Sequence, residues 1–231
     1  MDNGRTTNHL AGDTLVVNLV NAHKKITVIL VDDHVVVRAG FRMLLATEES
    51  IDVVAEAQRG EEVLQLYSQL QPDVIVMDLS MAGIGGLEAT HRLTTRYEQA
   101  KVIVFSVYHE KVYVQRALNA GAKGYICKHA HPEVLITAIK KVAGGAVFVE
   151  PDLMTETSSD LQTIVNNFSA REFDVFLLLA KGLTAHDISE KLCLSYKTVA
   201  NYGSSIRAKL EVSSSAELAH IALSLNLMTQ I

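Results

Sequence analysis

The spacing of hydrophobic positions along the chain changes near residue 150. From residue 26, short apolar runs alternate five times with segments in which apolar residues recur at every third or fourth position. This pattern predicts strands at 26–31, 51–57, 74–78, 101–106 and 124–128, and helices at 35–47, 60–70, 85–96, 110–120 and 132–143. Short links between alternating strands and helices favour right-handed crossovers. Residues 26–149 are therefore expected to form an α/β domain with a five-stranded, doubly wound parallel sheet.

A second, purely helical pattern follows a polar segment. Residues 150–167 begin with acidic residues and a proline, so we expect a linker there, in which 161–165 could form a short helical turn. Four helices are predicted near 170–181, 185–192, 196–210 and 214–226, in a small all-α domain that spans 168–231. Residues 1–25 are interpreted as a flexible N-terminal extension.

Polar side chains stand where four of the predicted strands end. Asp32 and Asp33 follow the first strand, Asp78 ends the third, Ser106 ends the fourth and Lys128 ends the fifth. The carboxyl ends of parallel strands meet at one edge of a sheet, where ligands bind. Three neighbouring carboxylates repel each other unless a cation neutralises them, and oxygen ligands suit Mg²⁺. The sequence thus predicts a magnesium site at this edge.

The order of these residues resembles the receiver domain of bacterial response regulators, which is flavodoxin-like. Pro72-Asp73 and the segment 121–125 extend the match over roughly residues 26–150. The resemblance implies that Asp78 accepts a phosphoryl group from a sensor histidine kinase. It implies four ligands for Mg²⁺: Asp32, Asp33, Asp78 and the backbone carbonyl of Ser80.

The same resemblance assigns roles to residues around the phosphoacceptor. Lys128 and Ser106 would bind the phosphoryl oxygens, and the ring of Tyr125 would move inward when Ser106 engages them. Ser80 and Tyr108 would flank the path of the water that removes the phosphoryl group. His34, which follows the acidic pair, is interpreted as a first-turn helix residue without a metal role.

The helical domain contains a predicted helix-turn-helix, in which a short helix, a tight turn and a longer helix follow one another. Its second helix would enter the major groove through its N-terminal part. Several short motifs, among them 168–172, 187–192 and 197–199, resemble the LuxR-type domain of NarL/FixJ regulators as a set. The residues expected to contact DNA are Lys197, Thr198, Asn201, Tyr202, Ser204, Ser205 and Lys209.

Together the two resemblances imply a two-component response regulator that binds promoter DNA as a transcription factor and is not an enzyme. Phosphorylation would favour a homodimer, and RNA polymerase would be a further partner. Two alternatives stay open: a dimeric transcription factor that does not use phosphorylation, and a Mg²⁺-dependent phosphatase with an aspartyl-phosphate intermediate. The phosphatase is disfavoured because such enzymes carry a second aspartate where Ser80 stands.

Composition narrows the class of protein without changing this interpretation. The 231 residues are 48% hydrophobic, and the net charge of −5 gives no global signature of nucleic-acid binding, so a DNA-binding surface must be local. Cys127 and Cys193 are far apart in sequence and are expected as small buried residues in a reducing cytoplasm, not in a disulfide or a metal site. No apolar stretch is long enough for a membrane span, and no membrane partner is expected.

Overall fold

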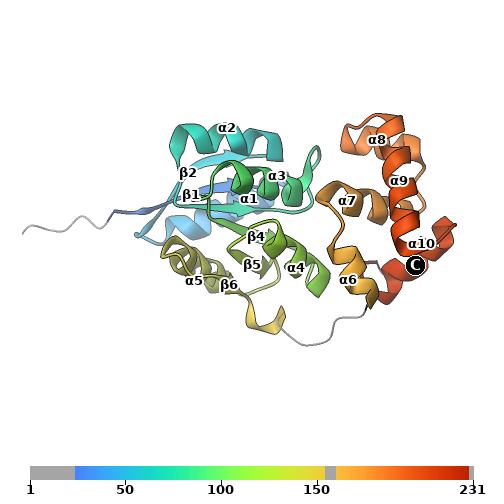
Figure 1. Ribbon diagram of the computed structural model, residues 1–231. Coiled ribbons are helices and arrows are strands. Elements are labelled where there is room, and N and C mark those ends of the chain that lie inside the picture. Colours follow the sequence, from blue (N-terminus) through green and yellow to red (C-terminus); the bar gives the residue numbers. More distant parts are fainter. Residues whose placement is uncertain (1–23, 154–159, 229–231) are drawn as a thin grey trace, which may run out of the picture.

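The computed structural model describes residues 24–153 and 160–228, which form an α/β part followed by an all-helical part (Figure 1). The sheet of the α/β part is wholly parallel, in the order β2-β1-β3-β4-β5-β6. Its strands are β1 (Ile26–Val31), β2 (Ile51–Ala57), β3 (Val74–Met77), β4 (Val102–Ser106), β5 (Gly124–Cys127) and β6 (Phe148–Val149). The prediction of five strands was therefore one short, because the two-residue β6 pairs with the edge of β5.

Helices cover both faces of the sheet. They are α1 (Val35–Ala46), α2 (Gly60–Leu70), α3 (Gly85–Arg96), α4 (Lys111–Asn119) and α5 (Pro132–Ala143). Successive strand residues point to opposite faces. In β1, Val28 and Leu30 therefore pack in the core cluster that contains residues of α1 and α5, whereas Ile29 and Val31 pack in the cluster that contains residues of α2 and α3.

The sheet order reverses at β1, which pairs with β2 on one side and β3 on the other. Val31 is the register partner of Met77, and the amide of Asp78 donates to the carbonyl of Val31 at 2.9 Å. The residues that follow these two strands are therefore neighbours. On the other side of β3, the amide of Lys128 donates to the carbonyl of Ser106 at 2.7 Å. Register thus gathers the polar strand ends at one edge.

The C-terminal part consists of α6 (Asp160–Asn166), α7 (Ala170–Ala180), α8 (Ala185–Leu192), α9 (Tyr196–Leu210) and α10 (Ser215–Ser224), after a 3-10 turn at Pro151–Leu153. Capping boxes begin α7, α8 and α10, as the Ser169-to-Glu172 spacing illustrates. Cys193, at the tight turn between α8 and α9, has a left-handed backbone with φ 52°. Its thiol is exposed, so the expectation of a buried side chain was wrong for Cys193 and is confirmed for Cys127. The segment α8-turn-α9 is a helix-turn-helix. The described part of the predicted extension at 1–25 is limited to Lys24 and Lys25.

The two parts share one hydrophobic cluster. Val104 and Tyr125 of the sheet and Tyr113 of α4 belong to the same buried cluster as Val165 of α6 and Phe173 of α7. The predicted linker is therefore more structured than its polar composition indicated, since α6 packs against α4 (Figure 1). Among the described helices, none is both long enough and apolar enough to cross a membrane.

Candidate functional site

The acidic residues of the first and third strands converge with a lysine at the carboxyl edge of the sheet. Asp78 directly follows β3, and only 2% of its surface is exposed. The Nζ atom of Lys128 lies 2.7 Å from Oδ2 of Asp32 and 3.0 Å from Oδ2 of Asp78. The ammonium group therefore bridges two carboxylates that follow adjacent strands.

This rim remains short of positive charge and of hydrogen-bond donors. The Oδ1 atoms of Asp33 and Asp78 are buried and accept no hydrogen bond within the described structure. Burial raises the pKa of Asp78, with a further rise from Asp32, and Lys128 opposes both effects. Orphaned buried carboxylate oxygens are costly unless a cation satisfies them. The donor set fits a hard divalent ion, because candidate ligand atoms of Asp32, Asp33 and Asp78 lie within 4.8 Å of one another.

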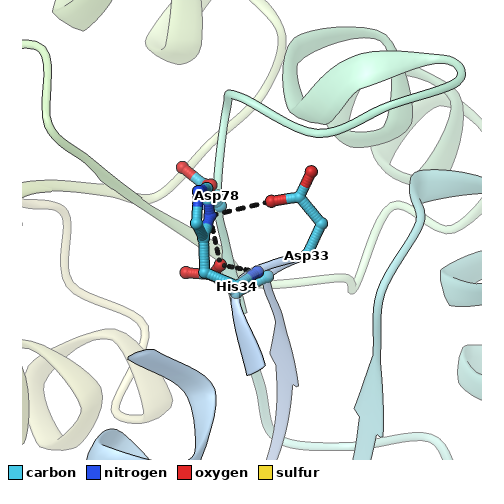
Figure 2. A group of neighbouring side chains, drawn as sticks. Asp33, His34 and Asp78 are labelled. Atoms are coloured by element: carbon cyan, nitrogen blue, oxygen red, sulfur yellow. Dashed lines mark hydrogen bonds and ion pairs between the residues drawn. The ribbon is translucent and has the colours of Figure 1, made fainter. Parts of the chain in front are cut away.

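His34 adds an imidazole to the same cluster. It is the N-cap residue of α1, and its side chain makes no capping hydrogen bond. Instead, its Nδ1 atom lies 2.9 Å from Oδ1 of Asp33 and 3.2 Å from Oδ1 of Asp32. Figure 2 shows the ring turned toward the Asp33 carboxylate. The interpretation of His34 as an ordinary first-turn residue overlooked this contact.

The loop from β3 to α3 closes one side of the rim and carries Ser80. A Cβ atom at Gly86 would lie 1.9 Å from the carbonyl oxygen of Asp78, so only glycine fits the close packing of α3 against the loop. At the other end of the loop, Glu61 of α2 accepts a hydrogen bond from the amide of Ile84 at 3.0 Å. The close approach of Gly86 and the Glu61 hydrogen bond fix the backbone of the loop that follows Asp78.

The predicted switch residues lie on the neighbouring strands. Ser106 is fully buried, and its Oγ atom accepts from the amide of Tyr108 at 3.3 Å. The ring of Tyr125 is also fully buried, so it already lies inside the fold, and its hydroxyl donates to the carbonyl of Tyr108 at 2.8 Å. Burial raises the pKa of the Tyr125 hydroxyl, which therefore stays a hydrogen-bond donor. Both switch residues thus meet at the backbone of Tyr108.

A row of aromatic rings leads from this point to the helical part. The ring of Tyr108 stacks on Tyr113 of α4 with centroids 4.2 Å apart, and Tyr113 meets Phe173 of α7 edge-on at 5.3 Å. The guanidinium of Arg116 lies 4.1 Å from the centroid of Phe173. The hydroxyl of Ser106 is thereby linked to the ring of Phe173 through the backbone of Tyr108 and the stacked rings of Tyr108 and Tyr113.

Arg116 is the main polar link between α4 and the helical part. Its guanidinium donates to the carbonyls of Val165 at 2.8 Å and Ser169 at 2.9 Å, and more distantly to Asn166 at 3.3 Å. These carbonyls lie at the end of α6 and at the N-cap of α7. Sequence reasoning missed Arg116, although an arginine amid the apolar positions of helix 110–120 was a visible signal.

The helical part also covers the acidic rim. A cavity of about 470 Å³ lies between the two parts beside their packed contact, and its lining includes Asp33, His34 and Ser80 on one side and Asp174 and Lys191 on the other. Arg171 of α7 donates to the carbonyl of Gly83 in the β3–α3 loop at 3.1 Å. The first helix of the helix-turn-helix and the preceding α7 therefore face the candidate phosphorylation site.

The predicted DNA-contacting residues lie on α9 in two groups. Lys197, Asn201 and Ser204 are exposed, Thr198 and Tyr202 are half-buried, and the Thr198 amide donates to the N-cap Ser195 at 3.1 Å. Ser205 and Lys209 instead contact one carboxylate oxygen of Glu172 within the helical part, at 3.0 Å and 2.6 Å.

Gly203 lies on the buried side of α9. A Cβ atom there would lie 3.1 Å from the Arg207 guanidinium and 3.5 Å from Leu179 of α7. A side chain at this position would thus be in ordinary contact with α7, and its tighter contact would be with the movable end of Arg207 on α9 itself.

Comparisons with known proteins agree with this architecture. Residues 28–140 match the response regulator receiver domain family, and residues 166–222 match the luxR family of bacterial regulatory proteins. The chain is 38% identical to the transcriptional activator protein ExaE of Pseudomonas putida over 87% of this chain and 97% of that protein. It is also 38% identical to the response regulator GacA of Pseudomonas aeruginosa, over 86% and 95% of the two chains. A solved structure of the response regulator RcsB of Salmonella typhimurium superposes with a TM-score of 0.67 at 25% identity, over 87% of this chain and 98% of that one.

Proposed function

Because this chain belongs to the NarL/FixJ family of response regulators, with a receiver domain and a LuxR-type DNA-binding domain, we propose that Asp78 is its phosphorylation site. The phosphoryl donor is a sensor histidine kinase, and the phosphorylated form binds promoter DNA as a homodimer. The observation that carries the proposal is the buried carboxylate of Asp78. Neither of its oxygens accepts a hydrogen bond within the described structure, and Oδ2 lies 3.0 Å from Nζ of Lys128.

The chemistry follows from the charges at the rim. An oxygen of Asp78 attacks phosphorus, the bond from phosphorus to the donor's histidine nitrogen breaks, and that nitrogen keeps the electron pair. Lys128 lies 3.0 Å from Asp78 and supplies positive charge to the transferred group. Asp32, Asp33, Asp78 and the Ser80 carbonyl would hold Mg²⁺, which when bound neutralises the charge of the phosphoryl oxygens. The hydroxyl of Ser106 would donate a hydrogen bond to one of those oxygens.

Movement of Ser106 toward a phosphoryl group would alter the backbone of Tyr108, because the two are hydrogen-bonded. Tyr125 shares that backbone, and the stacked rings of Tyr108 and Tyr113 continue to Phe173. A shift at the switch would therefore strain the contact between α4 and α7. We infer that phosphorylation releases the DNA-binding domain from the receiver domain through this row of rings.

Lys197, Asn201 and Ser204 of α9 are exposed even while the two domains are in contact. Since the receiver domain does not bury these side chains, docking would restrain the orientation of the helix-turn-helix and leave its DNA-facing residues exposed. In the docked form, Lys191 of α8 faces the cavity beside the acidic rim. Two released domains could then pair on a two-fold symmetric DNA site.

The domain bounds follow from the ends of the helices and strands, and the further partner follows from the family. The receiver domain would span residues 26–149, the linker 150–167 and the DNA-binding domain 168–231, with α6 of the linker docked on α4. RNA polymerase would be contacted at the promoter. The matched families are DNA-binding transcription regulators, and no enzymatic role is proposed.

Intact-mass measurement with acetyl phosphate as phosphodonor tests the phosphorylation site. We expect a mass increase of one phosphoryl group in wild type with Mg²⁺ and no increase in Asp78→Asn or with excess chelator. Asp73→Asn is the matched control, because Asp73 bonds to Thr27 away from the rim and should leave phosphorylation intact. Equal modification of Asp78→Asn and wild type would overturn the assignment. Lack of modification of wild type, together with DNA binding, would favour the phosphorylation-independent alternative.

A further inference from the structure

We propose that Arg38 of α1 is a positioning residue for the acidic rim: it holds the peptide bond between Asp32 and Asp33, and thereby sets how tightly the rim binds the divalent cation that phosphotransfer to Asp78 requires. The inference deepens the proposed function and rests on it. It concerns a buried arginine to which neither the receiver resemblance nor the phosphotransfer chemistry assigns a role.

Arg38 occupies a position of α1 that faces the core. Its side chain is only 8% exposed, and Arg38 and Leu45 are the two buried residues of this helix. A charged group loses its hydration in such a position, so a well-packed apolar side chain would often be at least as stable there. Stability alone therefore does not explain the arginine, and its contacts show what it holds.

The guanidinium group of Arg38 joins the acidic rim to the neighbouring strand β2. Its Nη1 atom donates a hydrogen bond to the backbone carbonyl of Asp32 at 2.6 Å, and its Nε atom donates to Oε2 of Glu56 at 2.7 Å. On the outer side, Nη1 of Arg42 donates to Oε1 of Glu56 at 2.5 Å. The hydrogen bonds from Arg42 and Arg38 lower the pKa of the Glu56 carboxyl, which therefore stays an ionised acceptor at neutral pH. Because a guanidinium is planar, two donors held in this way fix its orientation.

The carbonyl that Arg38 holds belongs to the peptide bond between the two acidic residues. This unit is planar, so its rotation would change ψ of Asp32 and φ of Asp33 together and would move the Asp33 carboxylate relative to that of Asp32. On the other side of the same residue, the Asp32 amide donates to the carbonyl of Ala57 in β2 at 3.1 Å. The backbone of Asp32 is thus held on both sides, and Arg38 holds the side that leads to Asp33.

The charge of Arg38 and its contact with the carbonyl have opposite effects on cation binding. Arg38 and Asp78 line the same small cavity, so removal of the guanidinium takes a positive charge away from the rim and by itself should strengthen the binding of a cation. Loss of the carbonyl contact should instead weaken binding, because the acidic ligands no longer converge. We expect the second effect to be larger, since the ion pair with Glu56 already balances the charge of Arg38. The direction of the change therefore separates positioning from electrostatics.

Titration of the full-length protein with Mg²⁺ alone, without a phosphodonor, tests the inference. The chemical shifts of the Asp33 and Ser80 backbone amides in heteronuclear NMR spectra report the occupancy of the rim. We expect Arg38→Met to raise the Mg²⁺ concentration at half-saturation by about tenfold or more, as loss of an outer partner of a metal ligand typically does. Arg38→Lys should also raise it, because a lysine keeps the charge but lacks the planar fork that holds Asp32 and Glu56 together.

Phosphorylation with acetyl phosphate separates cation affinity from the transfer step. At saturating Mg²⁺, the rate for both Arg38 variants should approach that of wild type, because Asp78 and Lys128 keep their own contact. Arg42→Ala is the matched control: it removes an arginine from the same helix and from the same partner, Glu56, and leaves the hydrogen bond to Asp32 in place. Its half-saturation should match that of wild type.

An unchanged or lower half-saturation in the Arg38 variants would overturn the positioning role. A lower melting temperature with an unchanged half-saturation would identify Arg38 as a structural residue only. If circular dichroism shows that Arg38→Met does not fold, Arg38→Lys decides the question, because it retains the charge that balances Glu56. Absence of Mg²⁺-induced shifts in wild type, or equal shifts in Asp78→Asn, would instead contradict the cation site of the proposed function.

Discussion

Replacing Arg116 by alanine should release the DNA-binding domain without phosphorylation. In wild type its guanidinium donates two short hydrogen bonds, at 2.8 Å and 2.9 Å, and lies 4.1 Å from the centroid of Phe173. Hydrogen bonds from a charged donor contribute about 1.5 kcal/mol or more each. A buried cation over an aromatic ring contributes on the order of 1–2 kcal/mol.

Burial of the charge opposes these gains, and it lowers the pKa of Arg116 to about 10. Allowing roughly 2 kcal/mol for that cost leaves a net docking contribution of about 2–3 kcal/mol. At 1.4 kcal/mol per factor of ten, Arg116→Ala should raise the ratio of open to docked molecules by about 30- to 150-fold. Arg116→Met should have a smaller effect, because its unbranched stem can still pack on Phe173.

Pulsed electron paramagnetic resonance between labels on the two domains measures the open population. Cys193 is exposed and can carry one label, Ser68→Cys on α2 can carry the other, and Cys127 is buried. The matched control is Arg42→Ala, which removes an exposed arginine paired with Glu56, away from the domain contact. A distance distribution for Arg116→Ala that superimposes on that of wild type would refute the role assigned to Arg116.

Three further predictions address DNA contact, phosphoryl lifetime and pH. Lys197→Ala should weaken binding to cognate and scrambled duplexes about equally and reduce the salt dependence by about one phosphate contact, whereas Asn201→Ala should relax preference at particular bases; titrations at several salt concentrations separate the two. Tyr108→Ala should speed loss of the phosphoryl group if the ring shields it from water, and an unchanged decay of the phosphoprotein would exclude that role. Burial raises the pKa of the Asp174 carboxyl from 3.8 to about 7. The positive charges of Arg171 and Arg116 lower this pKa, and the negative charge of Glu88 raises it further. Between these two pKa values the docked form holds a proton on Asp174 that the open form releases. Docking should therefore weaken as the pH rises from about 4 to 7 and should not change further above pH 7. Asp174→Asn should abolish this pH dependence in the same distance measurement.

The fold and the acidic rim could be predicted because their signals are local. Apolar runs that end in Asp32, Asp78 or Lys128 mark both the strands and the edge at which they end. A parallel sheet then brings those ends together, whatever the details of side-chain packing. The capping boxes of the helical part are equally local, as Ser169 and Glu172 illustrate. The strand β6 was not predicted, because two residues are too few to show the alternation of apolar and polar positions that marks a strand.

The contacts between the two domains could not be predicted in this way. Arg116 bonds to backbone carbonyls roughly fifty positions further along the chain, and these are placed by α6, a helix within a segment of polar composition. The direction of the His34 side chain depends on a rotamer that sequence spacing does not specify. The sequence likewise did not show that Gly203 lies on the side of α9 that faces Leu179 of α7.

The most direct test of the account measures the distance between the labels at Cys193 and Ser68→Cys before and after phosphorylation by acetyl phosphate with Mg²⁺. The account predicts a shift to longer and broader distances in the otherwise wild-type protein, and no shift when Asp78→Asn is added. An unchanged distance in protein whose intact mass proves full phosphorylation would contradict the release of the DNA-binding domain. An equal shift in the Asp78→Asn protein would contradict the assignment of Asp78 as the residue that controls it.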